Sequence, residues 1–484
     1  GALRPWWLRI SEKWFWFAMS AASCGVTWWM QRLAGATDSV GGYTMANRVM
    51  NMFAAYGAYV LKTLVPVHLA AFYPHPLDTP WVAGTASLIL LVAIMSLVHT
   101  ARRNAPWAYI GWFWFLGTLI PVIGLVQVGA QAYADRYMYL PLIGLSLPGA
   151  LACSLNRKAR TIGLLCLAYW IPFTWVQVGY WRDSETLFRH AIAVTRNNDL
   201  AHYNLGTHYL AQKRFQEAER EFAETVRIRP GYSEARANLG VAQIEQGRYE
   251  EAVDTFRKGL EYAPDHANTH ANLGVALLRT NRADEASAHF EKAASLGAND
   301  PVMMVSLGEA LVRARRNAGA ADVLEKVLIA RPELVQAHYA LGKALFGLGR
   351  LDEAVTAFKA YLAVRPGNAA AQVDLGVALG SKGDLDGAER AFAAALAIVP
   401  GMPDAEFNLG NIAFMRGQFE AARARYQAAA DVRPKDTEAR CALGMTLQRM
   451  GRSSEAVAEY RRVLEVNPEH KGAKSALAAI GAKP

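Results

Sequence analysis

The sequence is poor in cysteine and lacks the short motifs of common catalytic sites. It holds four cysteines in 484 residues, and none belongs to a CxxC pair. A disulfide framework is therefore not indicated, and neither is a zinc site. No HExxH, GxSxG or Walker sequence occurs either, so nothing points to a zinc protease, a serine hydrolase or a P-loop enzyme. We predict no metal site and no cofactor that the sequence itself requires.

Acidic side chains are scarce in the first part of the chain. Residues 1–180 carry 12 Lys and Arg but only 4 Asp and Glu, whereas residues 181–484 carry 39 and 38. Nearly all of the net charge of +9 therefore lies in the first part, between apolar runs. A nucleic-acid-binding protein would instead carry a basic stripe on a soluble domain. The pattern indicates a membrane protein with cationic loops, which contacts lipid and no nucleic acid.

Five apolar runs are long enough, or nearly so, to cross a bilayer as helices. They are Trp14–Met30, Pro80–Thr100, Pro106–Val128, Met138–Leu155 and Ile162–Tyr180. The loops at 101–104 and 156–160 are basic and free of acids, which marks the cytoplasmic side. The chain after Trp181 is then predicted to lie outside, in the periplasm of a bacterial inner membrane or in the ER lumen.

A sixth apolar segment, Ala46–Val65, carries polar groups at helical spacing. One face of such a helix would hold Arg48, Asn51, Ala55, Tyr59 and Lys62. A full crossing would place the basic start of the chain outside, against the charge rule. We therefore predict an amphipathic helix in the outer membrane interface, with a further span as the alternative.

The remainder of the chain is an internal repeat of 34 residues. A Leu-Gly pair marks each unit, with glycines at Gly206, Gly240, Gly274, Gly308, Gly342, Gly376, Gly410 and Gly444. Twelve residues after each Gly stands an alanine, and four further on a bulky apolar residue. Proline closes every unit except the third, which has Ala298. These markers identify tetratricopeptide repeats (TPRs), in which two helices pack as one unit and neighbouring units share a core.

The predicted fold is therefore all-α: a multispan helical membrane domain followed by a TPR solenoid. The membrane domain would occupy residues 1–181. A capping helix follows at 182–198, eight repeats span 199–470, and a second capping helix occupies 471–484. A solenoid of this kind binds a protein or peptide partner on its inner, concave face.

Polar side chains precede several of the Leu-Gly pairs, at a position that faces the concave surface in stacked TPRs. They are Asn204, Asn238, Asn272, Asp374 and Asn408. Their amide groups can hydrogen-bond the backbone of an extended peptide; the alternative is that Asn belongs to the ordinary repeat pattern. No lysines precede them to clamp a peptide carboxylate, which disfavours a C-terminal carboxylate as the ligand.

The order of motifs in the first part resembles one enzyme family. "EKWFWFAMSAASCGVTWW", "ANRVMNMFAAYGAYVLKTLVPVHLAAFYP", "YADRYMYLPLIGL" and "WRDSETLFRHAI" follow one another and run directly into the repeats. This order is similar to the transmembrane-and-TPR O-mannosyltransferases and their bacterial relatives, which are multispan, lipid-linked-sugar glycosyltransferases. The resemblance implies transfer from a polyprenyl-phosphate sugar donor to a protein outside. It also implies a catalytic acid in an early outer loop, which we expect upstream of Gly1.

Cations near the outer interface are candidates for holding such a lipid phosphate. Arg136, Arg48 and Lys62 are the candidates, and Asp135 stands beside Arg136. The alternative for Arg136 is an interfacial anchor paired with Asp135. Two functions stay open: the C-terminal part of a glycosyltransferase, or a non-catalytic membrane-anchored TPR scaffold.

Overall fold

A computed structural model describes residues 45–71, 73–74, 81–120, 123, 131–155 and 157–482. The chain divides into two compact units, Gly1–Thr255 and Phe256–Pro484, called here the N-terminal and C-terminal units. The predicted span Trp14–Met30 and the end of the predicted span Pro106–Val128 lie outside the described residues.

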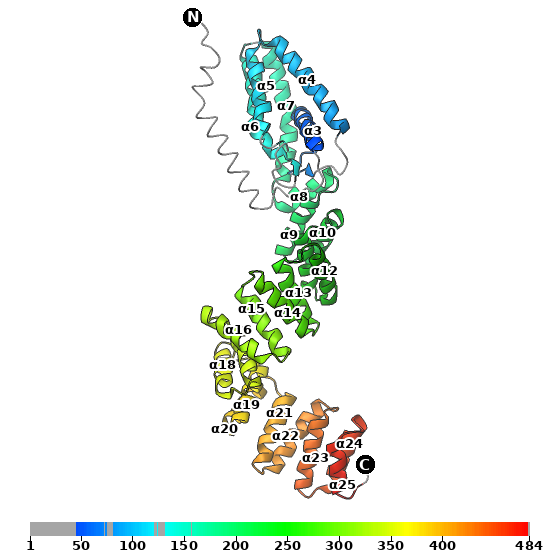
Figure 1. Ribbon diagram of the computed structural model, residues 1–484, viewed down its shortest axis with the longest axis vertical. Helices are drawn as coiled ribbons and strands as arrows, with labels where there is room; N and C mark the ends of the chain where they lie inside the picture. Colours follow the sequence, from blue (N-terminus) through cyan, green and yellow to red (C-terminus); the bar gives the residue numbers. More distant parts are fainter. Residues whose placement is uncertain are drawn as a thin grey trace. The chain divides into compact units, whose positions relative to one another are not determined.

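The N-terminal unit begins with a helical bundle and continues into the first repeats (Figure 1). The bundle helices are α3 (Met45–Leu64), α4 (Trp81–Ala101), α5 (Pro106–Leu119), α6 (Tyr139–Leu155) and α7 (Arg157–Tyr180). Each contacts its neighbour in the chain. The basic segment at 101–104 joins α4 to α5, and the basic residues Arg157, Lys158 and Arg160 lie in the first turn of α7.

Small residues allow a close helix contact in the bundle, between α5 and α6. A Cβ atom on Gly111 would overlap the carbonyl oxygen of Gly144, so no larger residue fits at this crossing. Aromatic and aliphatic side chains of α3 and α5 fill the core beside it, among them Tyr59, Trp112 and Phe115. The described parts of the apolar runs thus build one packed bundle.

The polar row of α3 is turned into the bundle. Asn51, Ala55 and Tyr59 on this row are buried, whereas Leu61 and Leu64 are exposed. The hydroxyl of Tyr59 donates to the carbonyl oxygen of Ala134 and accepts from the backbone N–H of the same residue. The polar face therefore satisfies buried backbone groups, which periodicity alone could not reveal.

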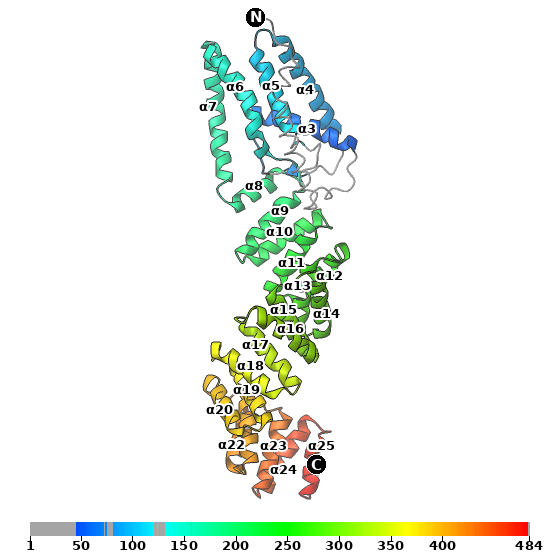
Figure 2. The ribbon, with the colours of Figure 1, turned by 60° about the vertical axis from the view of Figure 1, so that its left-hand side comes forward.

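Two short strands, which the sequence analysis did not predict, join the loops at one end of the bundle. β1 (Tyr73–Pro74) and β2 (Gln131–Tyr133) pair antiparallel. β2 leads into a 3₁₀ helix, η2 (Asp135–Met138), and then into α6. Figure 2 shows α8 at one end of the bundle, and the α4–α5 and α6–α7 connections at the opposite end.

The repeats are pairs of helices, called here the first and second helix of each unit. In the N-terminal unit the helices are α8 (Ser184–Val194), α9 (Asp199–Ala211), α10 (Phe215–Ile228), α11 (Ser233–Glu245) and the start of α12 (Tyr249–Tyr262). In the C-terminal unit, α12 ends and is followed by α13 (Ala267–Arg279), α14 (Ala283–Ser295), α15 (Pro301–Arg313), α16 (Asn317–Ala330), α17 (Val335–Gly347), α18 (Leu351–Val364), α19 (Ala369–Lys382), α20 (Leu385–Ile398), α21 (Pro403–Met415), α22 (Phe419–Val432), α23 (Thr437–Arg449), α24 (Ser453–Val466) and α25 (Lys471–Ala479).

The repeat markers meet inside the helix pairs that lie within one unit. A Cβ atom on Gly376 of α19 would lie 2.6 Å from the ring of Phe392 on α20, and the same contact recurs at Gly206 with Phe222. The glycine is therefore required because the bulky residue of the second helix packs against the backbone of the first. Successive first helices also contact one another, as α15 and α17 do. They form a continuous surface within each unit, called here the first-helix face.

Candidate functional site

The predicted concave-face residues share one position on successive first helices, and all five are half-buried. They lie on α9, α11, α13, α19 and α21 as Asn204, Asn238, Asn272, Asp374 and Asn408. The structure therefore gives each of them an accessible edge on the first-helix face.

Some of these residues are already engaged within the chain. The phenol of Tyr339 donates to Asp374 Oδ2 at 2.6 Å, and Asn238 Nδ2 donates to the hydroxyl of Tyr203 at 3.4 Å. Each tyrosine comes from the preceding repeat, so these polar groups join neighbouring units. Asn408 Nδ2 donates to the carbonyl oxygen of Asp404 at 2.7 Å, which leaves its Oδ1 as the acceptor for a ligand.

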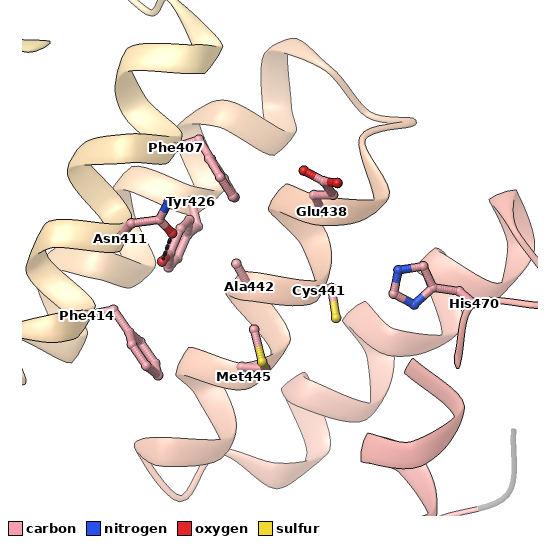
Figure 3. A pocket seen from close by; sticks show the side chains of 9 residues that line it. All are labelled: Phe407, Asn411, Phe414, Tyr426, Glu438, Cys441, Ala442, Met445 and His470. Atoms are coloured by element: carbon pink, nitrogen blue, oxygen red, sulfur yellow. Dashed lines mark hydrogen bonds between the residues drawn. The ribbon is translucent and has the colours of Figure 1, made fainter. Parts of the chain in front are cut away.

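The C-terminal unit has an open pocket of about 400 Å³ on its first-helix face. It lies between α21 and α23 and reaches the turn before α25 (Figure 3). The lining side chains are Phe407, Asn411, Phe414, Tyr426, Glu438, Cys441, Ala442, Met445 and His470. Its volume is within the range of small-ligand pockets, roughly 300–1,000 Å³.

Packing fixes the aromatic wall of this pocket. The ring of Phe407 lies 5.7 Å from the ring of Tyr426, in a tilted arrangement. The same geometry recurs in two other repeats, between Tyr203 and Phe222 and between Tyr339 and Phe358 at 5.9 Å. The aromatic residue before the polar position is therefore held by the second helix of its own repeat.

The polar groups of the pocket have defined roles. Tyr426 donates to Asn411 Oδ1 at 2.7 Å (dashed in Figure 3), which leaves the Asn411 amide hydrogens to face a ligand. His470 Nδ1 accepts from the backbone N–H of Ala473 and caps α25. Burial raises the pKa of the Cys441 thiol, which makes it a slow nucleophile at neutral pH. Glu438 forms no ion pair within the described part of the chain.

A second, smaller pocket of about 230 Å³ adjoins the first on the other side of α21. Asn408 and Asn411 line it from α21, and Gly376, Gly380 and Ser381 line it from α19. Asn411 belongs to both pockets. The two pockets therefore flank one helix and share one polar residue.

Asp135 is the centre of a different cluster, in the N-terminal unit. Its Oδ2 accepts from the hydroxyl of Tyr73 at 2.6 Å and from the backbone N–H of Ala70 at 2.7 Å. Its Oδ1 lies 3.4 Å from Lys62 Nζ, and both side chains of this ion pair are largely buried. Lys62 Nζ also lies 3.3 Å from the ring centre of Tyr73. The carboxylate thus ties α3 and the loop after it to η2.

The four predicted phosphate-binding residues are not all brought together. Arg48 lies near the start of α3 and is not part of the Asp135 cluster. The side chain of Arg136 lies outside the described residues. Burial lowers the pKa of Lys62 to about 8, against the opposing effect of Asp135. Lys62 is therefore held as the partner of Asp135, and its charge is already balanced.

The same loop packs on the beginning of the repeats. His190 Nε2 on α8 contacts the carbonyl oxygen of Leu69 at 3.0 Å, and its ring stacks on Tyr180 with centres 3.6 Å apart. Ala70 and Tyr73 share a small core with α8 and α9. The Asp135 cluster thus supports the joint between the bundle and the first repeat. Among the residues that the structure describes, no group of three or more His, Cys, Asp or Glu is placed to hold a metal ion.

The sequence predicted the concave-face residues on the first helices but not the pocket beside Asn408. Asn411 stands three residues after Asn408, one helical turn further along the same face. Cys441 and Met445 lie one turn apart on the next first helix. The sequence signal that could have revealed the pocket is the set of first-helix positions that follow each Leu-Gly pair. These positions recur every 34 residues, as the pairs do.

These observations define a helical-repeat solenoid with an open face for a ligand. Two family profiles, both described as "Tetratricopeptide repeat", match the chain. The first matches residues 176–233, 305–369 and 339–403, and the second matches residues 209–271, 243–303, 379–440 and 413–480. The chain is a tetratricopeptide-repeat protein, and the repeats predicted from the sequence are confirmed.

Among curated proteins, "Protein O-mannosyl-transferase Tmtc2" of Drosophila melanogaster is 30% identical over 121 residues. The match covers 23% of this chain and 12% of that protein, and it lies in the repeats. The predicted membrane resemblance is therefore not part of this match.

Solved TPR structures are similar over part of the chain. YrrB, "a TPR protein with an unusual peptide-binding site", is 24% identical, with 38% of this chain and 95% of YrrB covered and a TM-score of 0.35. The C-terminal part of a TPR protein from Cytophaga hutchinsonii is 16% identical, with 50% and 99% covered and a TM-score of 0.39. PilW, a type IV pilus biogenesis factor, is 20% identical, with 44% and 98% covered and a TM-score of 0.38.

Proposed function

We propose that this protein is a membrane-anchored TPR scaffold that binds an extended segment of a protein partner on its first-helix face. The observation that carries the proposal is the pair of adjoining pockets on either side of α21, with Asn408 and Asn411 between them. Apolar walls with a few fixed polar groups are the usual composition of a binding site. Amides on a helix face can pair with the backbone of an extended segment.

Two bundle helices support the membrane anchor. α4 and α7 are long and apolar enough to cross a bilayer, and their apolar side chains are largely exposed. Val82 on α4 is 87% exposed and Trp175 on α7 is 83% exposed. Contiguous exposed apolar surface of this kind calls for lipid or another partner.

The charge of the loops gives the orientation of the proposed anchor. The basic α4–α5 connection and the basic first turn of α7 share one end of the bundle, and α8 begins at the other (Figure 2). Because basic loops are retained in the cytoplasm, the repeats would lie outside, in the periplasm or the ER lumen.

Site-specific photocrosslinking in cells tests the scaffold proposal. A photoreactive amino acid replaces Asn411 on the first-helix face, and the matched control replaces Val432, an exposed residue on a second helix. We expect discrete protein adducts from position 411 and none of the same size from position 432. Adducts of equal pattern from both positions, or none from position 411, would contradict a partner on this face.

The second candidate function is that of the C-terminal part of a polyprenyl-phosphate-sugar-dependent protein glycosyltransferase. Its support is the similarity of the repeats to the O-mannosyl-transferase of Drosophila. Arg136 and Arg48 are the remaining candidates for the donor phosphate, because Lys62 is engaged by Asp135. Binding of a short-chain polyprenyl phosphate in mixed micelles tests this. Arg136→Ala should weaken binding, and equal binding by the variant removes Arg136 from the site.

A further inference from the structure

We propose that the pocket between α21 and α23 takes one large apolar side chain of an extended peptide whose neighbouring cationic side chain pairs with Glu438. This inference rests on the proposed scaffold function and names the chemistry of its ligand. The occupant is a segment of a partner protein with an apolar and a basic residue on the same side of an extended backbone.

The apolar walls carry the first part of the inference. Phe407 and Phe414 face the pocket from α21, and Met445 faces it from α23 (Figure 3). Met445 is 46% exposed although it stands beside a buried core. A large apolar side chain that filled the space would cover this surface and gain the hydrophobic free energy of burial. A methionine wall also adapts its shape to an aliphatic or an aromatic guest.

The carboxylate of Glu438 carries the second part. It lines the pocket and forms no ion pair within the described part of the chain. The nearest base on α23, Arg440, is turned away, because it donates to Glu459 and to the carbonyl oxygen of Pro434. The charge at the rim is therefore unbalanced and complements a lysine or arginine of the ligand.

The spacing along α23 fixes where that cation stands in the ligand. Glu438 lies three and four residues before Cys441 and Ala442, which also line the pocket, about 4.5–6 Å along the helix axis. Side chains on the same side of an extended peptide are about 6.6 Å apart. A basic residue two positions from the apolar residue therefore reaches Glu438 while the apolar residue fills the pocket.

Two amides on α21 hold the ligand backbone. Asn411 has its Oδ1 occupied by Tyr426 and presents N–H donors. Asn408 has its Nδ2 occupied by the carbonyl of Asp404 and presents an acceptor. One residue donates and the other accepts, one helical turn apart, so together they complement the C=O and N–H groups of a peptide.

Peptide binding to the purified full chain tests the proposal. The probes are fluorescent seven-residue peptides of Gly and Ser that carry Phe and Lys two residues apart, in both orders. We expect saturable binding of at least one of them. Met445→Asp should weaken it at least tenfold, since it places a charge in the apolar wall. The matched control Val466→Asp, at a site 45% exposed on α24, should change it less than twofold.

Paired changes in the protein and in the peptide test the ion pair between Glu438 and the cationic side chain of the ligand. Glu438→Gln should weaken the lysine peptide about threefold, as for a partly exposed ion pair. It should leave a peptide with Gln in place of Lys unchanged. Equal loss for both peptides would overturn the ion pair. Equal binding of a peptide with Ser in place of Phe would overturn the apolar anchor.

The native thiol of Cys441 reports occupancy. With Cys24, Cys153 and Cys166 changed to Ser, bound peptide should slow alkylation of Cys441. Protection that depends on protein concentration without peptide would mean that a second copy fills the pocket, and would overturn the proposal. If no peptide binds while photocrosslinking from position 411 still captures a partner, the ligand chemistry is wrong and the scaffold function stands. If both fail, the function itself falls.

Discussion

Two glycines of α19 give a sharp test of how the repeats are held together. Gly376 and Gly380 stand one turn apart on the same helix. A Cβ at Gly376 would lie 2.6 Å from the ring of Phe392, whereas a Cβ at Gly380 would lie 3.7 Å from Ala388 Cβ. The first distance requires a shift and the second is an ordinary contact. The ring of Phe392 is only 2% exposed, so it cannot move aside into solvent.

The two alanine substitutions should therefore have opposite signs. Overpacking of a buried ring costs about 1–3 kcal/mol, and replacing a helical Gly by Ala returns about 0.5–1 kcal/mol. Gly376→Ala should destabilise α19 and α20 by about 1–2 kcal/mol. Gly380→Ala should stabilise them by about 0.5–1 kcal/mol, because it gains helix propensity without a clash.

Hydrogen exchange of the full chain measures this locally. Peptides from α19 and α20 should exchange about tenfold faster in Gly376→Ala and a few-fold slower in Gly380→Ala, since about 1.4 kcal/mol is a factor of ten. A Gly376→Ala protein that exchanges like the wild type would refute the account of the repeat glycine. So would two variants with the same shift.

Three further predictions concern other parts of the chain. Asp135→Asn should speed hydrogen exchange of residues 66–71 about thirtyfold, which corresponds to roughly 2 kcal/mol, because an amide donor would face the Lys62 ammonium. Unchanged exchange would show that the Asp135 cluster does not hold this loop in place. Burial lowers the pKa of His289. Its contribution to stability is therefore present above about pH 6.5 and is lost as the pH falls below that value. His289→Gln should make the stability of α13 and α14 depend less on pH, as measured by hydrogen exchange of these helices at several pH values. Lys435→Cys, in an exposed turn, should be labelled by an impermeant maleimide in intact cells, and labelling only after membrane rupture would invert the topology.

The repeats could be predicted because their signal is local and redundant. Three marker positions return every 34 residues, and each reflects one contact between the two helices of a unit, such as Gly206 against Phe222. The bounds of the helices then follow from the turns between the markers. This periodicity remains detectable even when the residues at all non-marker positions differ.

The Asp135 cluster could not be predicted because its partners are distant in sequence. The carboxylate of Asp135 meets Lys62 and Tyr73, which precede it by 73 and 62 residues. The same contacts turn the polar row of α3 into the bundle, which its periodicity alone did not indicate.

The pocket was missed because it is a property of two successive repeats. Phe407 and Met445 belong to different first helices, and neither residue departs from an ordinary apolar surface position by itself. The polar row was found because Asn408 and its equivalents stand beside the Leu-Gly marker. Asn411 directly follows Gly410, but no other repeat holds an amide at the equivalent position, so no recurring side chain pointed to it. Its role follows from the hydrogen bond that Tyr426 makes to it.

The central claim is that a protein partner binds across α21 and α23. The most direct measurement is hydrogen exchange of the full chain with and without the partner captured by photocrosslinking. We predict slower exchange in α21 and α23 and no change in the second helices α22 and α24. Protection confined to α22 and α24, or to the bundle helices, would contradict the claim.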